Sequence, residues 1–259
     1  MISTTEEFLG YAVSVASAAE CCKDVFVRAL DQRDENPKCT WLACLNPHAY
    51  AVALNDPVFA EALRATDWLV ADGVGVVIAS RILGGQVRER VTGFDIFSNL
   101  QQQMNAVGGL SVFFLGSTEG TLKEIRKRMA VDFPQIRIAG TYSPPFKAKF
   151  SATDLDEMIG AVNRSGADVL WVGMTAPKQE KWIFENRARL QVKFAGAIGA
   201  VFDFYTGRVK RSHPAFQRMG LEWLPRLVQQ PQRLWRRMFV SAPIFLADVF
   251  RERIQRVFS

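Results

Sequence analysis

The chain has 259 residues, of which 49% are hydrophobic and 22% are charged. This is ordinary for a soluble globular protein and is enough for one large domain, or one domain with an appendage. Four cysteines in a chain of this length do not indicate a disulfide framework, so we expect reduced thiols and a cytosolic compartment. The sequence shows neither a signal peptide pattern nor a run of about 18 uncharged apolar residues, so no membrane-spanning helix is expected.

Short apolar runs alternate with helical patterns along most of the chain. In chain order, the predicted strands are residues 39–45, 67–73, 110–117, 136–143, 167–174 and 193–207, the last continuing into a loop. The predicted helices are residues 46–56, 57–66, 74–85, 93–109, 121–134, 151–166 and 177–190. This alternation predicts an α/β fold with a mostly parallel sheet and helices on both faces.

The C-terminal fifth of the chain differs from the rest. From residue 208 to residue 259 there are eleven Lys or Arg residues against three acids. Predicted helices there are broken at Pro225, Pro231 and Pro243, and arginines alternate with Trp and Leu. We therefore predict an α/β domain at 1–207 and a basic amphipathic appendage at 208–259 that contacts an anionic membrane surface. Nucleic acid is a weaker alternative, because no nucleic-acid-binding motif is present.

Polar residues cluster at the predicted strand ends. In parallel α/β sheets, ligands bind beyond the carboxyl ends of the strands. One corner, "GMTAPKQE" at 173–180, ends a strand with glycine and begins a helix with proline, and the free N–H groups of its first turn can receive an anion. The candidate substrate-contacting residues at these ends are Cys44, Asn46, Asp72, Gly116, Ser117, Lys178, Gln179, Glu180 and Asp203. Carboxylate, amide and basic groups converging on one edge suit phosphate–sugar chemistry.

Several of these residues have structural alternatives that the sequence leaves open. Asp72 with Gly73 is also a common turn pair, and Asn46 alone is better explained as a helix cap. The alternative for Gly116 is a role only in a tight turn, and the alternative for Glu180 is a favourable interaction with a helix dipole.

Three further groups are better explained structurally. The carboxylate pair in "TDLD" at 153–156 could bind a metal, but it lies at a helix start where Ser151 or Thr153 is expected to cap. We expect His48 and His213 to be structural, and the cysteines to be small core residues.

The order of several motifs resembles the WecG/TagA/CpsF glycosyltransferases, glycosyltransferase family 26. The matching segments are "LNPH", "VADGVGVVIASRILGG", "RERVTGFD", "FFLGS", "DVLWVGMTAPKQEKWI", "AGAIGAVFDFYTGRVKR" and "GLEWLPRLVQQPQRLWRR". The resemblance implies a Rossmann-like domain with a C-terminal helical appendage. It also implies transfer from a UDP-sugar to a polyprenyl-diphosphate-linked sugar at the cytoplasmic membrane face, without metal or cofactor.

The resemblance assigns the catalytic roles residue by residue. It places the catalytic aspartate at Asp72, the active-site amides at Asn46 and Gln179, and the following arginine at Arg90. Arginines over the departing phosphate would be Arg226, Arg233 and Arg236. Many members have threonine where this chain has Cys44, and this departure is compatible with a GumM-like exopolysaccharide subgroup.

The leading hypothesis is an inverting β-glycosyltransferase. The donor would be of the UDP-glucose or UDP-N-acetylmannosamine type, and the product an exopolysaccharide or cell-wall polymer precursor. The alternative is a non-catalytic nucleotide-binding protein that docks on membrane. The sequence leaves the oligomeric state open, including a homo-oligomer.

Overall fold

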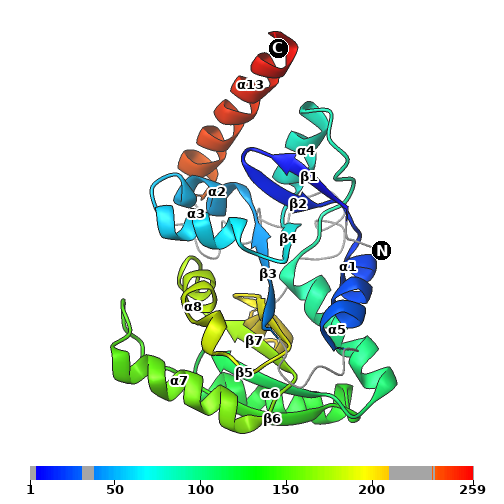
Figure 1. The fold of residues 1–259 in the computed structure, drawn as a ribbon, viewed down its shortest axis with the longest axis vertical. Coiled ribbons are helices and arrows are strands. Elements are labelled where there is room, and N and C mark those ends of the chain that lie inside the picture. Colours follow the sequence, from blue (N-terminus) through cyan, green and yellow to red (C-terminus); the bar gives the residue numbers. More distant parts are fainter. Residues whose placement is uncertain (1–3, 31–37, 210–234, 236, 259) are drawn as a thin grey trace.

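The computed structural model describes residues 4–30, 38–209, 235 and 237–258. A six-stranded sheet lies at the centre, with helices on both faces (Figure 1). Its order is β4-β3-β8-β7-β5-β6, and all neighbouring strands are parallel. The strands are β3 (Thr40–Leu45), β4 (Trp68–Ala71), β5 (Ser111–Gly116), β6 (Arg137–Tyr142), β7 (Val169–Gly173) and β8 (Phe194–Ala197). The predicted Rossmann-like α/β fold is confirmed.

The central strands are buried on both faces, which explains their continuous apolar runs. In β7, Val169 and Trp171 pack on one face of the sheet, whereas Leu170 and Val172 pack on the other. Because side chains alternate along a strand, each strand contributes to two separate cores. The first core lies on the face of Leu170 and Val172, and the second core lies on the face of Val169 and Trp171.

Two layers of helices cover the sheet. One face carries α2 (Pro47–Ala53), α3 (Pro57–Arg64), α4 (Val74–Ile82), α7 (Ala152–Ser165) and α8 (Lys178–Asn186). The other face carries α1 (Ala18–Val25), α5 (Gly93–Val107), α6 (Glu119–Asp132) and α9 (Val201–Tyr205). Short helical turns η1 (Phe26–Leu30) and η2 (Arg187–Arg189) extend α1 and α8.

The strand order creates a topological switch point between β5 and β7. The chain leaves β5 toward β6 at one edge of the sheet, whereas it leaves β7 toward β8 in the opposite direction. The connecting helices α6 and α8 therefore lie on opposite faces, and ligands of such sheets bind outside the carboxyl ends of the strands at this point.

Two regions differ from the sequence-based expectation. A hairpin of β1 (Thr5–Phe8) and β2 (Tyr11–Ser14), followed by α1, was not predicted. The predicted strand at 193–207 ends at Ala197, and the next apolar stretch forms the short helix α9. Its residues Val201 and Phe202 pack inward at helical spacing against the second core, which explains the difference.

The C-terminal helix α13 (Ala242–Phe258) packs along α2 and α4, and its C-terminal end projects beyond them (Figure 1). It follows the turn η3 (Arg237–Ser241), and Pro243 is its second residue, as expected of a helix start. Phe245 and Val249 are buried with α2 in the first core. The predicted breaks at Pro225 and Pro231 lie outside the described residues. No helix in the described ranges is long and apolar enough to cross a bilayer.

Candidate active site

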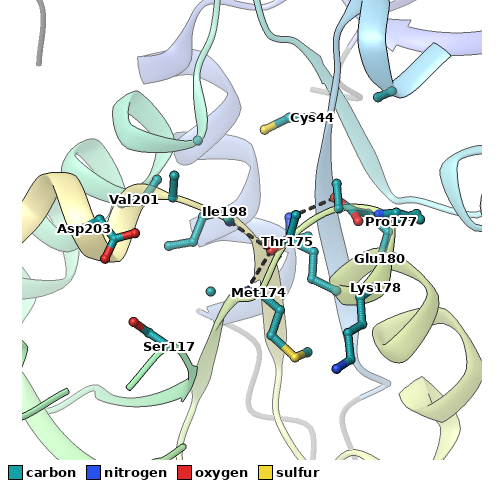
Figure 2. Close-up of a pocket in the computed structure, with 18 of the residues that line it drawn as sticks. Cys44, Ser117, Met174, Thr175, Pro177, Lys178, Glu180, Ile198, Val201 and Asp203 are labelled. Carbon is teal, nitrogen blue, oxygen red and sulfur yellow. Dashed lines mark hydrogen bonds between the residues drawn. The ribbon is translucent and has the colours of Figure 1, made fainter. Parts of the chain in front are cut away.

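A cavity of about 640 Å³ lies at the carboxyl ends of the strands. Residues following β3, β4, β5, β7 and β8 all line it, as the strand-end rule predicts. In Figure 2, Ser117 and Asp203 lie on one side of this space, and Lys178 and Glu180 lie on the other. The predicted residues that line it are Cys44, Asn46, Asp72, Ser117, Lys178, Gln179, Glu180 and Asp203.

Asp72 and Asn46 come together on neighbouring strands. Asp72 directly follows β4, and its backbone N–H donates to the carbonyl oxygen of Leu45 over 2.8 Å. Asn46 caps α2, because its Oδ1 accepts from the Ala49 N–H over 2.9 Å. This bond turns the amide nitrogen outward, and Nδ2 donates to Asp72 Oδ2 over 3.4 Å. The capping and active-site interpretations of Asn46 are therefore compatible in one side chain.

Gln179 joins the loops that follow β7 and β8. Its Oε1 accepts from the backbone N–H groups of Met174 (3.2 Å) and Gly199 (2.9 Å). Its Nε2 donates to Glu180 Oε1 over 2.8 Å (dashed lines in Figure 2). Both oxygen bonds fix the orientation of the amide, so only the second Nε2 hydrogen remains for a ligand.

Glu180 is a buried carboxyl group on the cavity wall. Glu180 lines the cavity, although only 3% of its surface is exposed. Burial raises the pKa of Glu180 to about 7, against the lowering effect of the Gln179 hydrogen bond. Such a value places the change of charge near neutral pH.

Cys44 stands at the end of β3 as a neutral thiol. Burial raises its pKa well above the usual value, and the Asp72 and Glu180 carboxylates raise it further. A thiolate nucleophile is therefore disfavoured at this position. Cys21, Cys22 and Cys39 are buried free thiols, as predicted for small core residues.

Two basic residues, Lys147 and Lys178, line the cavity at the loop after β6 and the start of α8. Lys178 lies 3.7 Å from the centroid of the Phe150 ring and donates to the carbonyl oxygen of Lys147. Partial burial lowers the pKa of Lys178, and Asp154 opposes this effect. The loop also places Phe146, which is fully exposed, at the cavity.

Gly116 supports the site without lining it. It ends β5 with a φ of +123°, and an added Cβ would lie 2.5 Å from the carbonyl oxygen of Gly173. Only glycine permits this approach, which brings the Ser117 N–H to 3.2 Å from the same oxygen. The tight-turn interpretation of Gly116 is thus the one that the structure supports.

Other predicted residues lie outside the cavity wall or outside the described residues. Arg90 does not line the cavity, although the neighbouring Val91 N–H donates to Ala71 O (2.9 Å) and so holds this segment beside the end of β4. Arg226, Arg233 and Arg236 lie outside the described residues.

The lining residues that the sequence analysis did not assign to the site include His48 and the loop from Pro144 to Phe150. The start of α5, predicted at residue 93, also lines the cavity, and Thr92 forms a capping box with Asp95 there. The loop carries no comparable signal.

The acidic pair in "TDLD" is engaged in structural contacts. Ser151 and Asp154 form a capping box, so the capping interpretation is confirmed with Ser151 as the cap. Lys147 hydrogen bonds and the Ser151 bonds lower the pKa of Asp154 to about 2. Asp156 pairs with Arg189 over 2.6 Å. Within the described residues, no group of three or more His, Cys, Asp or Glu side chains could hold a metal ion.

His48 connects the cavity to the C-terminal segment. Its Nδ1 lies 2.9 Å from Ser241 Oγ, and Tyr50 on the same helix donates to Asp248 over 2.9 Å. Arg208, on the far side, donates to Thr118 and Thr121 at the start of α6. The described residues on both sides of the gap at 210–234 are therefore anchored beside the cavity.

Comparison with known proteins matches this arrangement to one family. The sequence model of the glycosyl transferase WecG/TagA/CpsF family matches residues 6–258. The chain belongs to the WecG/TagA/CpsF glycosyltransferase family. It is therefore an enzyme, a glycosyltransferase, as the motifs implied.

Two relatives carry the same name, N-acetylglucosaminyldiphosphoundecaprenol N-acetyl-beta-D-mannosaminyltransferase. The protein of Bacillus spizizenii (strain ATCC 23059 / NRRL B-14472 / W23) is 32% identical over 218 residues, 84% of this chain and 81% of the relative. The protein of Bacillus subtilis (strain 168) is 28% identical over 211 residues, 82% of this chain and 79% of the relative.

Proposed function

We propose that this WecG/TagA/CpsF member transfers a hexosyl group from a UDP-sugar to a sugar linked to polyprenyl diphosphate, with inversion at the anomeric carbon. The observation that carries the proposal is the position of Asp72 on the cavity wall, with the Asn46 amide directed at its carboxylate. The names of the two relatives support a polyprenyl-diphosphate acceptor. UDP-glucose and UDP-N-acetylmannosamine are both candidate donors.

The proposed reaction is a single displacement. Asp72 accepts the proton of the acceptor hydroxyl, whose oxygen forms a bond to the anomeric carbon of the donor. The bond from that carbon to the diphosphate oxygen breaks, and its electron pair leaves with UDP. Because attack and departure occur on opposite faces, an α-linked donor gives a β-linked product.

Charge on the departing UDP must be offset by the protein. The N-terminal turns of α6 and α8 adjoin the cavity and present backbone N–H groups. Lys178 adds a positive charge at the mouth. We propose that Arg226, Arg233 and Arg236 complete this role in place of a metal ion, since guanidinium groups bind phosphate in a bidentate manner.

We further propose that the protein is peripheral on the inner face of the cell membrane. An acceptor with a long polyprenyl chain is met at a bilayer. Supporting this, α13 exposes large apolar side chains together with Arg251 and Arg253. Those exposed apolar residues are Ile244, Leu246, Phe250, Ile254, Val257 and Phe258.

The test measures UDP release and product formation with defined substrates. UDP-N-acetylmannosamine and UDP-glucose are each combined with short-chain polyprenyl-diphosphate-linked N-acetylglucosamine and glucose, with and without EDTA. We expect one donor and acceptor pair to give a β-linked product, and activity to survive EDTA. Asp72→Asn should lower turnover about 100-fold, the usual scale for loss of a general base.

The control is Asp156→Asn, a surface acid on α7 that pairs with Arg189. It should leave turnover unchanged. Wild-type turnover in folded Asp72→Asn protein would remove Asp72 as the base, and absence of transfer with every pair would refute the proposed function.

A further inference from the structure

The buried carboxyl group of Glu180 has one oxygen that the fold leaves unused. Oε1 accepts a hydrogen bond from Gln179 Nε2 over 2.8 Å. Oε2 is fully buried, and no group among the described residues bonds it. A buried carboxyl oxygen without a partner is costly, so its retention on a cavity wall calls for an explanation.

The neighbours of Glu180 fix which oxygen can receive a ligand. Gln179 is held by the Met174 and Gly199 N–H groups, so its amide cannot rotate away from Oε1. Oε1 is therefore the acceptor oxygen of the carboxyl, and Oε2 is the oxygen that a proton would occupy. A protonated Oε2 is a hydrogen-bond donor for which the described residues provide no acceptor.

The charges around Glu180 do not stabilise an anion there. Lys181, on the same helix, is paired with Asp56 of α3 over 2.9 Å. Lys178 lies over Phe150 and contacts the Lys147 carbonyl. Cys44 of β3 is a thiol that stays neutral, and the Asp72 and Glu180 carboxyl groups both raise its pKa. His48 of α2 also lines the cavity and bonds Ser241.

We propose that Glu180 is a neutral carboxylic acid and that binding of the sugar that meets Asp72 uncovers Oε2, whose O–H then donates a hydrogen bond to an oxygen atom of that sugar. This inference rests on the proposed glycosyl transfer and adds a specificity-determining contact to it. The sugar hydroxyls and the carbonyl of an N-acetyl group are all acceptors of the required kind. The raised pKa of Glu180 agrees with a proton held there near neutral pH.

The first experiment compares pH profiles of kcat/KM, which report groups of the free enzyme. With a pKa near 7, the protonated fraction at pH 8.5 is about one thirtieth, so kcat/KM of the wild type should fall roughly thirtyfold from pH 6 to pH 8.5. In Glu180→Gln the amide donates at every pH, so this alkaline fall should disappear while the acidic limb remains. Glu185→Gln, an exposed acid on the same helix, is the matched control and should follow the wild type.

A second variant separates contact with substrate from structural support. Glu180→Ala should lower kcat/KM at least tenfold at pH 6, mainly through KM, and Glu180→Gln should restore most of that loss. An equal loss in both folded variants would mean that the ionised carboxylate acts, which overturns the proposal. Unchanged kinetics in Glu180→Ala, or an alkaline fall that persists in Glu180→Gln, would overturn it as well.

Infrared spectroscopy gives a readout that does not depend on activity. The C=O stretch of a protonated carboxyl that is present at pH 6 in wild type and missing in Glu180→Gln would identify the proton directly. Its absence at pH 6 refutes the protonated Glu180. If the band is present but no substrate pair gives transfer, the proposed function fails while the protonation of Glu180 stands.

Discussion

Asn46 shows how one side chain can serve both folding and chemistry. Its carbonyl oxygen caps α2, and the same bond directs its amide nitrogen at Asp72. The two tasks use opposite ends of one amide group. A substitution that keeps only the oxygen therefore separates them.

We predict that Asn46→Ser leaves stability nearly unchanged and lowers turnover about tenfold, because serine caps the helix but offers no amide donor to Asp72. Asn46→Ala should lose both functions, with about 1 kcal/mol less free energy of unfolding. Denaturant unfolding and steady-state kinetics on the same preparations measure the two effects. If Asn46→Ser kept wild-type turnover, the amide would serve only as a cap.

Glu180 makes the free energy of unfolding depend on pH. Its pKa is about 7 in the folded protein, against the ordinary value of 4.5. Between these values the native state binds more protons than the unfolded chain, so the free energy of unfolding falls as pH rises from 4.5 through 7. The full loss is at most about 3 kcal/mol, at about 1.4 kcal/mol for each pH unit between the two pKa values.

We predict that Glu180→Gln escapes this loss. The difference in free energy of unfolding, variant minus wild type, should increase by up to about 3 kcal/mol between pH 5 and pH 8.5. Urea unfolding at the two pH values measures the difference, with Glu185→Gln as control. A constant offset between the variant and wild type at both pH values would contradict the raised pKa.

At the scale of elements, the close approach of the carboxyl ends of β5 and β7 depends on glycine. The end of β5 adopts a positive φ at Gly116 and packs against the backbone of Gly173. The next residue, Ser117, also has a positive φ, of 55°. This turn delivers Ser117 to the cavity and begins α6 at Thr118, so the anion-receiving end of that helix depends on it.

We predict that Gly116→Ala lowers the free energy of unfolding by about 1–3 kcal/mol, because the new methyl group meets backbone and the φ angle is strained. Gly120→Ala is the matched control. It lies in α6 with no close contact nearer than 3.9 Å, so alanine should stabilise by about 0.5 kcal/mol. Thermal unfolding measures the stability of both variants. Equal effects in the two variants would show that the close approach of Gly116 to Gly173 does not cause the loss of stability.

The regular elements could be predicted because their patterns are local. Buried parallel strands such as β7 are continuous apolar runs, and a capping box at Ser151 marks the start of α7. The strand-end rule then located Asp72, Asn46 and Glu180 on one wall, because parallel strands share an edge.

What could not be predicted depends on the tertiary path. Arg90 lies in a loop, and no local sequence pattern determines where its side chain points. The part of the wall formed by Pro144 to Phe150 has no periodicity in sequence. The orphaned oxygen of Glu180 likewise exists only because three backbone and side-chain groups hold Gln179 in place. The sequence shows the residues, whereas the geometry decides which atoms remain available.

At the scale of the whole molecule, α13 belongs partly to the core and partly to the surface. Phe245 packs against Phe8 and Tyr50, with ring centroids 6.0 and 5.5 Å away. Arg256 donates to the carbonyl oxygens of Leu83 and Glu7. Deleting the helix would therefore uncover core residues, so its membrane role is better tested by surface substitutions.

We predict that Phe250→Ser, Ile254→Ser and Phe258→Ser together reduce partitioning onto anionic vesicles about tenfold or more, because these exposed side chains would insert at the interface. The control replaces Val107 and Val131, which are exposed on α5 and α6. Vesicle sedimentation measures binding, and circular dichroism checks that the fold is intact. Unchanged partitioning of the triple variant would place the membrane contact elsewhere.

The bonds from α2 to the C-terminal segment join residues that are far apart in sequence. His48 and Ser241 are separated by 193 positions, and Tyr50 and Asp248 by 198. During synthesis a ribosome adds about 5–20 residues each second, so the partners of α2 are synthesised on the order of ten seconds or more after α2 itself. The helix that presents Asn46 to Asp72 therefore emerges long before its support. The described residues that line the cavity all lie at or before Phe204, whereas the contacts that hold α2 against the C-terminal segment form only near the end of translation.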